Sequence, residues 1–97
     1  MSYRYNYNSV FTLPLDDGTR ETRHLPVMVT FAEKRVRALM EKGEDVRDAI
    51  DLALEELRDE GWGTNSVVGW DTLKRVLSTE FKPLIQLARV RAAHKND

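Results

Sequence analysis

The sequence predicts an α+β fold in which an N-terminal antiparallel β-hairpin packs against three or four amphipathic helices. Residues 3–31 alternate apolar and polar positions with a period of two, interrupted by a turn at Asp16-Asp17-Gly18. Beyond residue 31 the apolar positions recur every three to four residues, which is typical of helices with one buried face. We expect one domain, 1–97, divided into a hairpin and four helices: 3–31, then about 31–42, 45–60, 72–81 and 83–93.

The register of the predicted hairpin follows from where its apolar residues lie. Odd-numbered apolar positions share a face in both strands, so a loop with an odd number of residues keeps them together. We therefore expect a bulged loop around Gly18, with Phe11 paired with Leu25. Three tyrosines extend the same face and are expected to pack in the core rather than stack on nucleic-acid bases: Tyr3, Tyr5 and Tyr7.

The first helix is expected to begin near residue 31, because Thr30 and Glu33 have the spacing of a capping box. Gly43 can end this helix, and Asp45 can cap the next one. That central helix has the clearest helical pattern in the chain. Its apolar positions should form a buried stripe: Val46, Ala49, Ile50, Ala53, Leu54 and Leu57.

Glycines and a proline divide the C-terminal third of the chain. Gly61 ends the central helix, and Trp62 should fold back on Leu57. Residues 61–69 contain three glycines and several polar residues, which is typical of a mobile loop or hinge. Asp71 should then cap a third helix. Pro83 suits the first turn of a last helix.

The last helix should turn Leu84, Leu87 and Ala88 inward. Ile85 and Val90 make it apolar on more than one face, which indicates either deep packing or an interface. A homodimer is one form that such an interface could take.

Several function classes lack support in the composition. The chain has no cysteine, and its histidines, His24 and His94, belong to no metal-ligand motif. The serines stand in no nucleophile-elbow context, and the glycines do not match a phosphate-binding loop. No apolar run reaches the length of a membrane span, and the N-terminal residues lack the apolar core of a signal peptide. We therefore expect a cytoplasmic, non-enzymatic protein without metal or cofactor.

The most distinctive candidate site is the polar side of the central helix. Residues 32–60 hold ten acidic and six basic side chains, whereas residues 61–97 hold three acidic and six basic. Carboxylates spaced three to four residues apart form a row of negative charge that roughly resembles a phosphate backbone. Leu52 borders this row as an apolar contact, and Trp70 would be an anchor if it were exposed. The expected partner-binding residues are Asp48, Asp51, Leu52, Glu55, Asp59 and Trp70.

Such a row of charge could bind the basic groove of a nucleic-acid-binding protein. Small proteins of phages and mobile elements that inhibit host complexes have this general character. The sequence therefore predicts a protein-binding inhibitor or adaptor, with an ordinary solvated helix surface as the simpler interpretation.

An alternative comes from the order of elements in residues 24–60: a strand, a helix, Gly43 and a second helix. This layout resembles the ribbon-helix-helix repressors. The resemblance implies a DNA-binding regulator whose strand, here His24–Thr30, enters the major groove and pairs with a second copy. The acidic balance of the segment opposes DNA binding, and the first predicted strand occupies the edge that a second copy would use.

Overall fold

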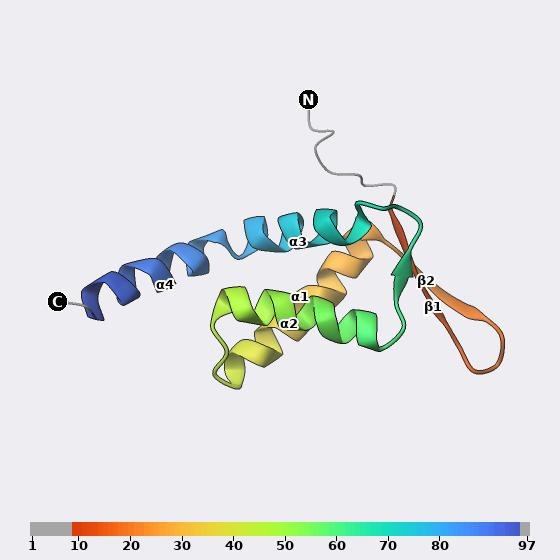
Figure 1. The fold of residues 1–97 in the computed structure, drawn as a ribbon, viewed down its shortest axis with the longest axis horizontal. Helices are drawn as coiled ribbons and strands as arrows, with labels where there is room; N and C mark the ends of the chain where they lie inside the picture. The colour runs from red at the N-terminus through yellow and green to blue at the C-terminus, as the bar shows by residue number, and fades with distance from the viewer. Residues whose placement is uncertain (1–8, 96–97) are drawn as a thin grey trace, which may run out of the picture.

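The computed structural model describes residues 9–95, with side chains as far as Arg91, and confirms the predicted α+β class (Figure 1). A three-stranded antiparallel sheet lies at one end, with strand order β2-β1-β3. Helices α1, α2 and α3 pack beside the sheet, and α4 extends away from them (Figure 1). The elements are β1 (Val10–Pro14), β2 (Arg20–His24), α1 (Leu25–Glu41), α2 (Val46–Asp59), β3 (Gly63–Thr64), α3 (Gly69–Glu80) and α4 (Lys82–Lys95).

The hairpin has the predicted parity but not the predicted register. Five residues separate the strands, and Gly18 takes a φ of 87° while its N–H donates to the Leu15 carbonyl at 3.1 Å. Phe11 pairs with Arg23, so its predicted pairing with Leu25 is wrong by two residues. The three tyrosines that were expected to pack in the core lie outside the described residues.

The register differs because α1 begins at Leu25, where the sequence predicted a strand continuing to residue 31. The apolar residues of segment 25–31 fit both the period of a strand and that of a helix. As a helix, this part of α1 buries Leu25, Met28, Val29 and, one residue further on, Ala32. Pro26 suits a first helical turn and has no N–H for a strand ladder. Thr30 lies inside the helix and its hydroxyl donates to the Pro26 carbonyl at 3.3 Å, so the expected capping box is wrong.

The expected mobile loop at 61–69 instead contributes the third strand. Thr64 pairs with Phe11, and the Asn65 side chain accepts the Val10 N–H at 3.0 Å. α3 then begins at Gly69 rather than at Asp71, which lies in the first turn and is not the cap. A Cβ at Gly69 would stand 2.4 Å from Thr64 Oγ1, so this start requires glycine.

The core lies between the sheet and the first three helices. Trp62 is buried, and its N–H donates to the Leu57 carbonyl at 3.2 Å beyond Gly61, whose φ is 111°. This is the predicted Schellman ending of α2. The largest fully buried side chains come from β1 and from all three helices: Phe11, Leu25, Met28, Val36, Ile50, Leu54, Leu57, Leu73 and Leu77.

α4 follows α3 after a break at Phe81, and Pro83 lies in its first turn as predicted. Phe81 is buried and Ile85 packs against the core. The prediction that Leu84 and Leu87 point inward is wrong, because these side chains are 37% and 43% exposed. The helix therefore contacts the rest of the chain through its first turns and along one side only.

Candidate functional site: the acidic face of α2

α2 is held rigidly at both ends and along one side. The Asp45 side chain accepts the Arg47 N–H at 3.1 Å and caps its N-terminus, while the Schellman ending closes its C-terminus. Its predicted apolar stripe is buried throughout. Any side chain on the opposite side of α2 therefore projects from a fixed backbone.

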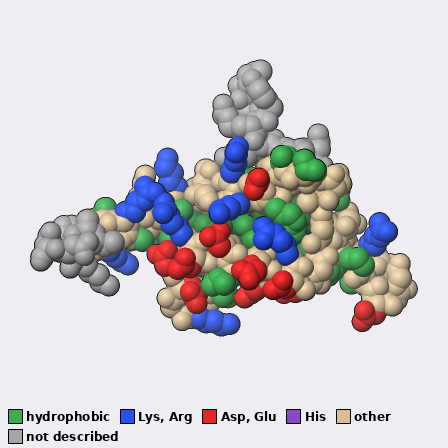
Figure 2. All heavy atoms as spheres, viewed as in Figure 1, with side chains coloured by type: hydrophobic (Ala, Val, Ile, Leu, Met, Phe, Trp, Pro, Cys, Tyr) green, Lys and Arg blue, Asp and Glu red, His purple; other side chains and the backbone are tan. Residues whose placement is uncertain are grey.

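That opposite side is the acidic face, which we define as Asp48, Asp51, Glu55 and Asp59. All four residues are exposed. Because they are three to four residues apart, their Cβ atoms follow one another at about 5–6 Å along the helix. Figure 2 shows acidic side chains gathered over α2, with basic side chains over the neighbouring α3 and α4.

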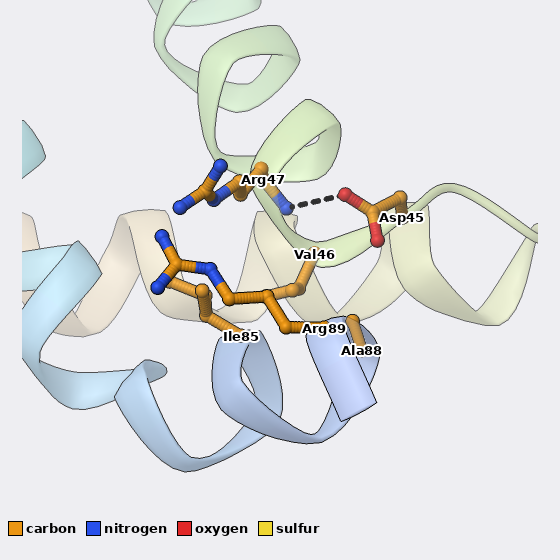
Figure 3. Close-up of a pocket in the computed structure, with 6 residues that line it drawn as sticks. All are labelled: Asp45, Val46, Arg47, Ile85, Ala88 and Arg89. Carbon is orange, nitrogen blue, oxygen red and sulfur yellow. Dashed lines mark hydrogen bonds between the residues drawn. The ribbon is translucent and has the colours of Figure 1, made fainter. Parts of the chain in front are cut away.

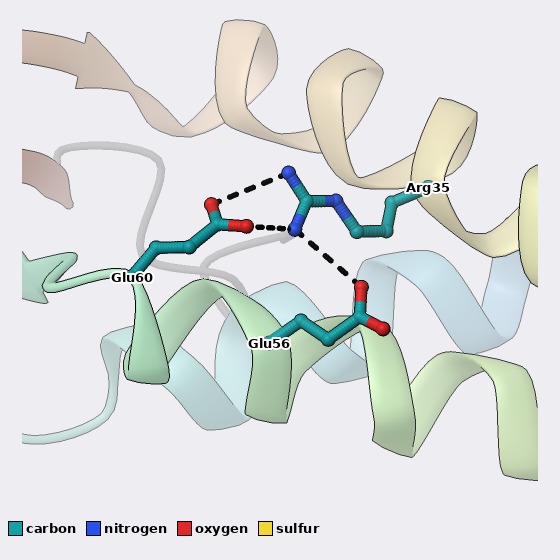
Figure 4. A network of polar contacts seen from close by, with 3 residues as sticks. All are labelled: Arg35, Glu56 and Glu60. Atoms are coloured by element: carbon teal, nitrogen blue, oxygen red, sulfur yellow. Dashed lines mark hydrogen bonds and ion pairs between the residues drawn. The ribbon is translucent and has the colours of Figure 1, made fainter.

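The remaining carboxylates near the C-terminal end of α2 have a structural role. Arg35 of α1 donates to Glu56 Oε1 at 3.4 Å and to both oxygens of Glu60 (Figure 4). The hydrogen bond that Arg35 donates to Glu60 raises the pKa of Arg35 above its usual value. This three-residue network joins α1 to α2, and both of its carboxylates share one cation partner within the chain.

The acidic face differs from that network because most of its carboxylates form no ion pair within the described residues. Asp51 Oδ1 accepts from Lys74 Nζ of α3 at 2.9 Å, an exposed pair of small energetic value. Among the described residues, Asp48, Glu55 and Asp59 form no ion pair. Three exposed negative charges therefore stand in a row on a fixed helix.

The two apolar residues assigned to the site are less accessible than predicted. Leu52 borders the acidic face but is half-buried. Trp70 is also half-buried, because its ring packs edge-on against Phe11 at 5.1 Å between ring centroids. The Arg58 guanidinium lies 5.0 Å from the Trp70 ring centroid. Trp70 therefore joins α3 to the sheet and to the end of α2, and presents only part of its ring beside the acidic face.

Sequence reasoning missed the contacts that divide the carboxylates of α2 into paired and unpaired ones. Arg35 precedes Glu56 by 21 residues and Lys74 follows Asp51 across a loop and a strand, so no local spacing signals either pair. The only available signal was that residues 56 and 60 lie toward one side of the helix and residues 48, 55 and 59 toward another.

The described residues contain no group of three or more His, Cys, Asp or Glu side chains placed to hold a metal ion. His24 lies exposed at the end of β2. In the described part of the chain, no helix combines the length and the apolar character needed to cross a membrane. The acidic face can therefore attract a cationic surface, and the described contacts assemble no acid–base pair or nucleophile there.

Comparison with known proteins adds no further assignment: no protein family, no curated protein and no solved structure matches this chain.

Proposed function

We propose that the protein is a non-enzymatic binding module that captures another protein through the acidic face of α2. The observation that carries this proposal is the row of three exposed carboxylates without a cation partner in the described chain: Asp48, Glu55 and Asp59. Their backbone is fixed by the buried stripe beneath them, so a partner would meet a preorganised row of charge.

Part of this row of carboxylates destabilises the isolated protein. This cost supports a role for the row in binding another molecule. Glu55 lies four residues from both Asp51 and Asp59, and like charges at this spacing destabilise a helix by about 0.2–0.5 kcal/mol per pair. Asp48 is different, because a carboxylate in the first turn interacts favourably with the helix dipole. A cationic partner surface would relieve the repulsion around Glu55.

The chemistry of the row indicates the class of partner. Negative charges along one side of a helix complement a groove lined by Lys and Arg, and nucleic-acid-binding proteins carry such grooves for phosphates. The proposal therefore describes a cytoplasmic inhibitor or adaptor of the kind encoded by phages and mobile elements, which occupies a nucleic-acid-binding groove of a host complex.

The test begins with the full chain immobilised in an extract of its native host, followed by identification and purification of the captured protein. Changing Asp48, Glu55 and Asp59 together to Lys should lower the affinity for that protein by about tenfold or more. The matched control changes Asp16, Glu41 and Glu80 to Lys, three exposed carboxylates on elements other than α2 with the same total change in charge. This control should bind nearly as the wild type does.

The partner class is tested with the same purified protein. Its own nucleic acid should compete with the chain, and the affinity should fall as salt is added. Circular dichroism must show that each triple variant is folded. Equal binding by the acidic-face variant and the control, or binding unaffected by nucleic acid, would contradict the proposal.

A DNA-binding role remains the second candidate, because the strand that precedes α1 and α2 differs from the one that the sequence predicted. Leu25–Thr30 is helical, so the strand that precedes the two helices is β2, not His24–Thr30 as predicted. β1 pairs with one edge of β2, as predicted, and within the described residues the other edge of β2 is unpaired. Arg20, Thr22 and His24 are exposed on one face of this strand.

This second candidate predicts that double-stranded DNA binds with a strong dependence on salt. Changing Arg20 and His24 to Ala should abolish a gel shift, while the Lys variant of Asp48, Glu55 and Asp59 should strengthen it by removing repulsion from phosphates. A weak shift that does not respond to salt would exclude this role and leave the protein-binding proposal intact.

A further inference from the structure

The apolar side chains of α4 are divided between an attached side and an uncovered side. Ile85 lines a groove together with Val46 at the start of α2 and packs against the core (Figure 3). Leu84, Leu87 and Val90 follow one another at intervals of three residues and are 37%, 43% and 52% exposed. Three uncovered aliphatic side chains along one helix are typical of an interaction surface.

A groove runs beside this uncovered side, which we call the α4 groove. Its volume is about 180 Å³, and apolar side chains of α1, α2 and α4 line it: Met40, Val46, Leu84, Leu87 and Ala88. Its charged residues are two exposed carboxylate groups on the turn between α1 and α2, Glu44 and Asp45, and Arg91 on α4. The groove therefore fits a helix that is apolar and basic.

The charges of the α4 groove indicate which kind of helix would bind in it. α4 contains four cationic residues between Lys82 and Lys95 and no acidic one. Among the described residues, Arg89 and Arg91 form no ion pair. The helix that the α4 groove would attract is thus present in this same chain, but α4 cannot enter a groove of which it forms one wall.

The opposite side of α4 is unsuited to the same occupant. There a second groove, also about 180 Å³, shares Asp45 with the α4 groove and adds Arg47 and Arg89, whose guanidinium groups point toward one another (Figure 3). This concentration of positive charge repels a basic helix. The α4 groove contains Glu44 and Asp45 against the single cation Arg91, so its carboxylates outnumber its cations.

We propose that α4 is the dimerisation element of this protein: the α4 helix of each copy lies in the α4 groove of the other. A twofold axis makes every contact occur twice, so Leu84 and Leu87 of each copy cover those of the other. Arg91 of each copy meets Glu44 of the other across the interface. This interface is separate from the acidic face of α2, which stays open to a third protein.

Light scattering or sedimentation across a range of concentrations tests the assembly directly. The full chain should form a dimer as concentration rises. Changing Leu84 and Leu87 to Glu should weaken dimerisation by about a hundredfold or more, because two charges would then be buried in each half of the interface. The matched control, Val27→Glu with Val67→Glu, replaces two exposed valines away from α4 and should dimerise as the wild type does.

An exchange of charge tests whether the occupant is a second copy. Glu44→Arg and Arg91→Glu should each weaken dimerisation, and the two changes together should restore it, because the opposite charges then face each other again. A wild type that stays monomeric would overturn the proposal. So would a dimer insensitive to the leucine changes, a failure of the double exchange to restore dimerisation, or a monomer whose α4 binds only a different protein.

Discussion

α2 and α4 are helices of 14 residues each, but they differ in how far their apolar residues are buried. α2 buries six apolar residues and shows its carboxylates, whereas α4 attaches through Ile85 and leaves Leu84, Leu87 and Val90 uncovered. α2 is rich in acidic residues, whereas the charged residues of α4 are all basic. α2 therefore completes the core of the single chain, and the contrast supports the proposal that a second copy covers α4.

The largest difference between the two helices should appear when a leucine is truncated on each. Leu57→Ala in α2 removes a side chain with no solvent exposure and should lower the free energy of unfolding by about 2–5 kcal/mol. Leu87→Ala in α4 should change it by less than about 0.5 kcal/mol at concentrations where the chain is monomeric. Urea titration of both variants measures this. Equal losses would show that α4 belongs to the monomer's core.

The next effect concerns the ending of α2. Gly61→Ala should cost about 1 kcal/mol or more, since φ there is 111° and the added Cβ would lie 3.1 Å from Leu13 Cδ1. Gly63→Ala is the matched control, because nothing lies within 4 Å of its Cβ position and its φ is not positive. Thermal unfolding should separate the two variants. A control that loses as much as Gly61→Ala would contradict this explanation of the ending.

These two helices also show what could be learned from sequence. α2 was predicted to within a residue because its period, its cap at Asp45 and its ending at Gly61 all agree, and each of these signals is local. The row of carboxylates on its outer side followed from the same period. α1 was placed too late, because residues 25–31 fit a strand and a helix equally well until the packing partners are known.

The orientation of α4 could not be predicted for a related reason. Apolar residues surround that helix, so its period does not specify an inward side, and only contacts with distant segments select Ile85 over Leu84. Paired and unpaired carboxylates of α2 were indistinguishable for the same reason, since Arg35 and Lys74 come from other elements. The α4 groove depends on three helices together and has no local pattern.

A smaller effect should separate the paired carboxylates of α2 from the unpaired ones. Arg35→Gln removes the only cation of the network at Glu56 and Glu60 and should lower stability by about 0.5–1 kcal/mol. Glu55→Gln should instead raise stability by a few tenths, about 0.2–0.5 kcal/mol, by relieving repulsion along the acidic face. Urea titration at low salt measures both changes. A loss of stability in Glu55→Gln would mean that the acidic face has an unrecognised role within the monomer.

The smallest effect lies in the hairpin, away from both helices. The Thr19 hydroxyl and N–H donate to Asp17 Oδ1 at 2.6 and 2.9 Å, and these bonds lower the pKa of Asp17. A lowered folded-state pKa means that the stabilisation is present above the unfolded pKa and is lost as pH falls through the folded value. NMR titration should give Asp17 a lower pKa in the wild type than in Thr19→Ala. Equal values would show that the turn does not hold this carboxylate.

Amide hydrogen exchange, measured at low and at high protein concentration, tests the contrast between α2 and α4 most directly. α2 should show the same strong protection at both concentrations, because its apolar side is buried within one chain. α4 should exchange rapidly beyond its first turns in the dilute protein and become protected as the concentration rises. Protection of α4 that equals that of α2 in the dilute sample, or that does not change with concentration, would contradict the account.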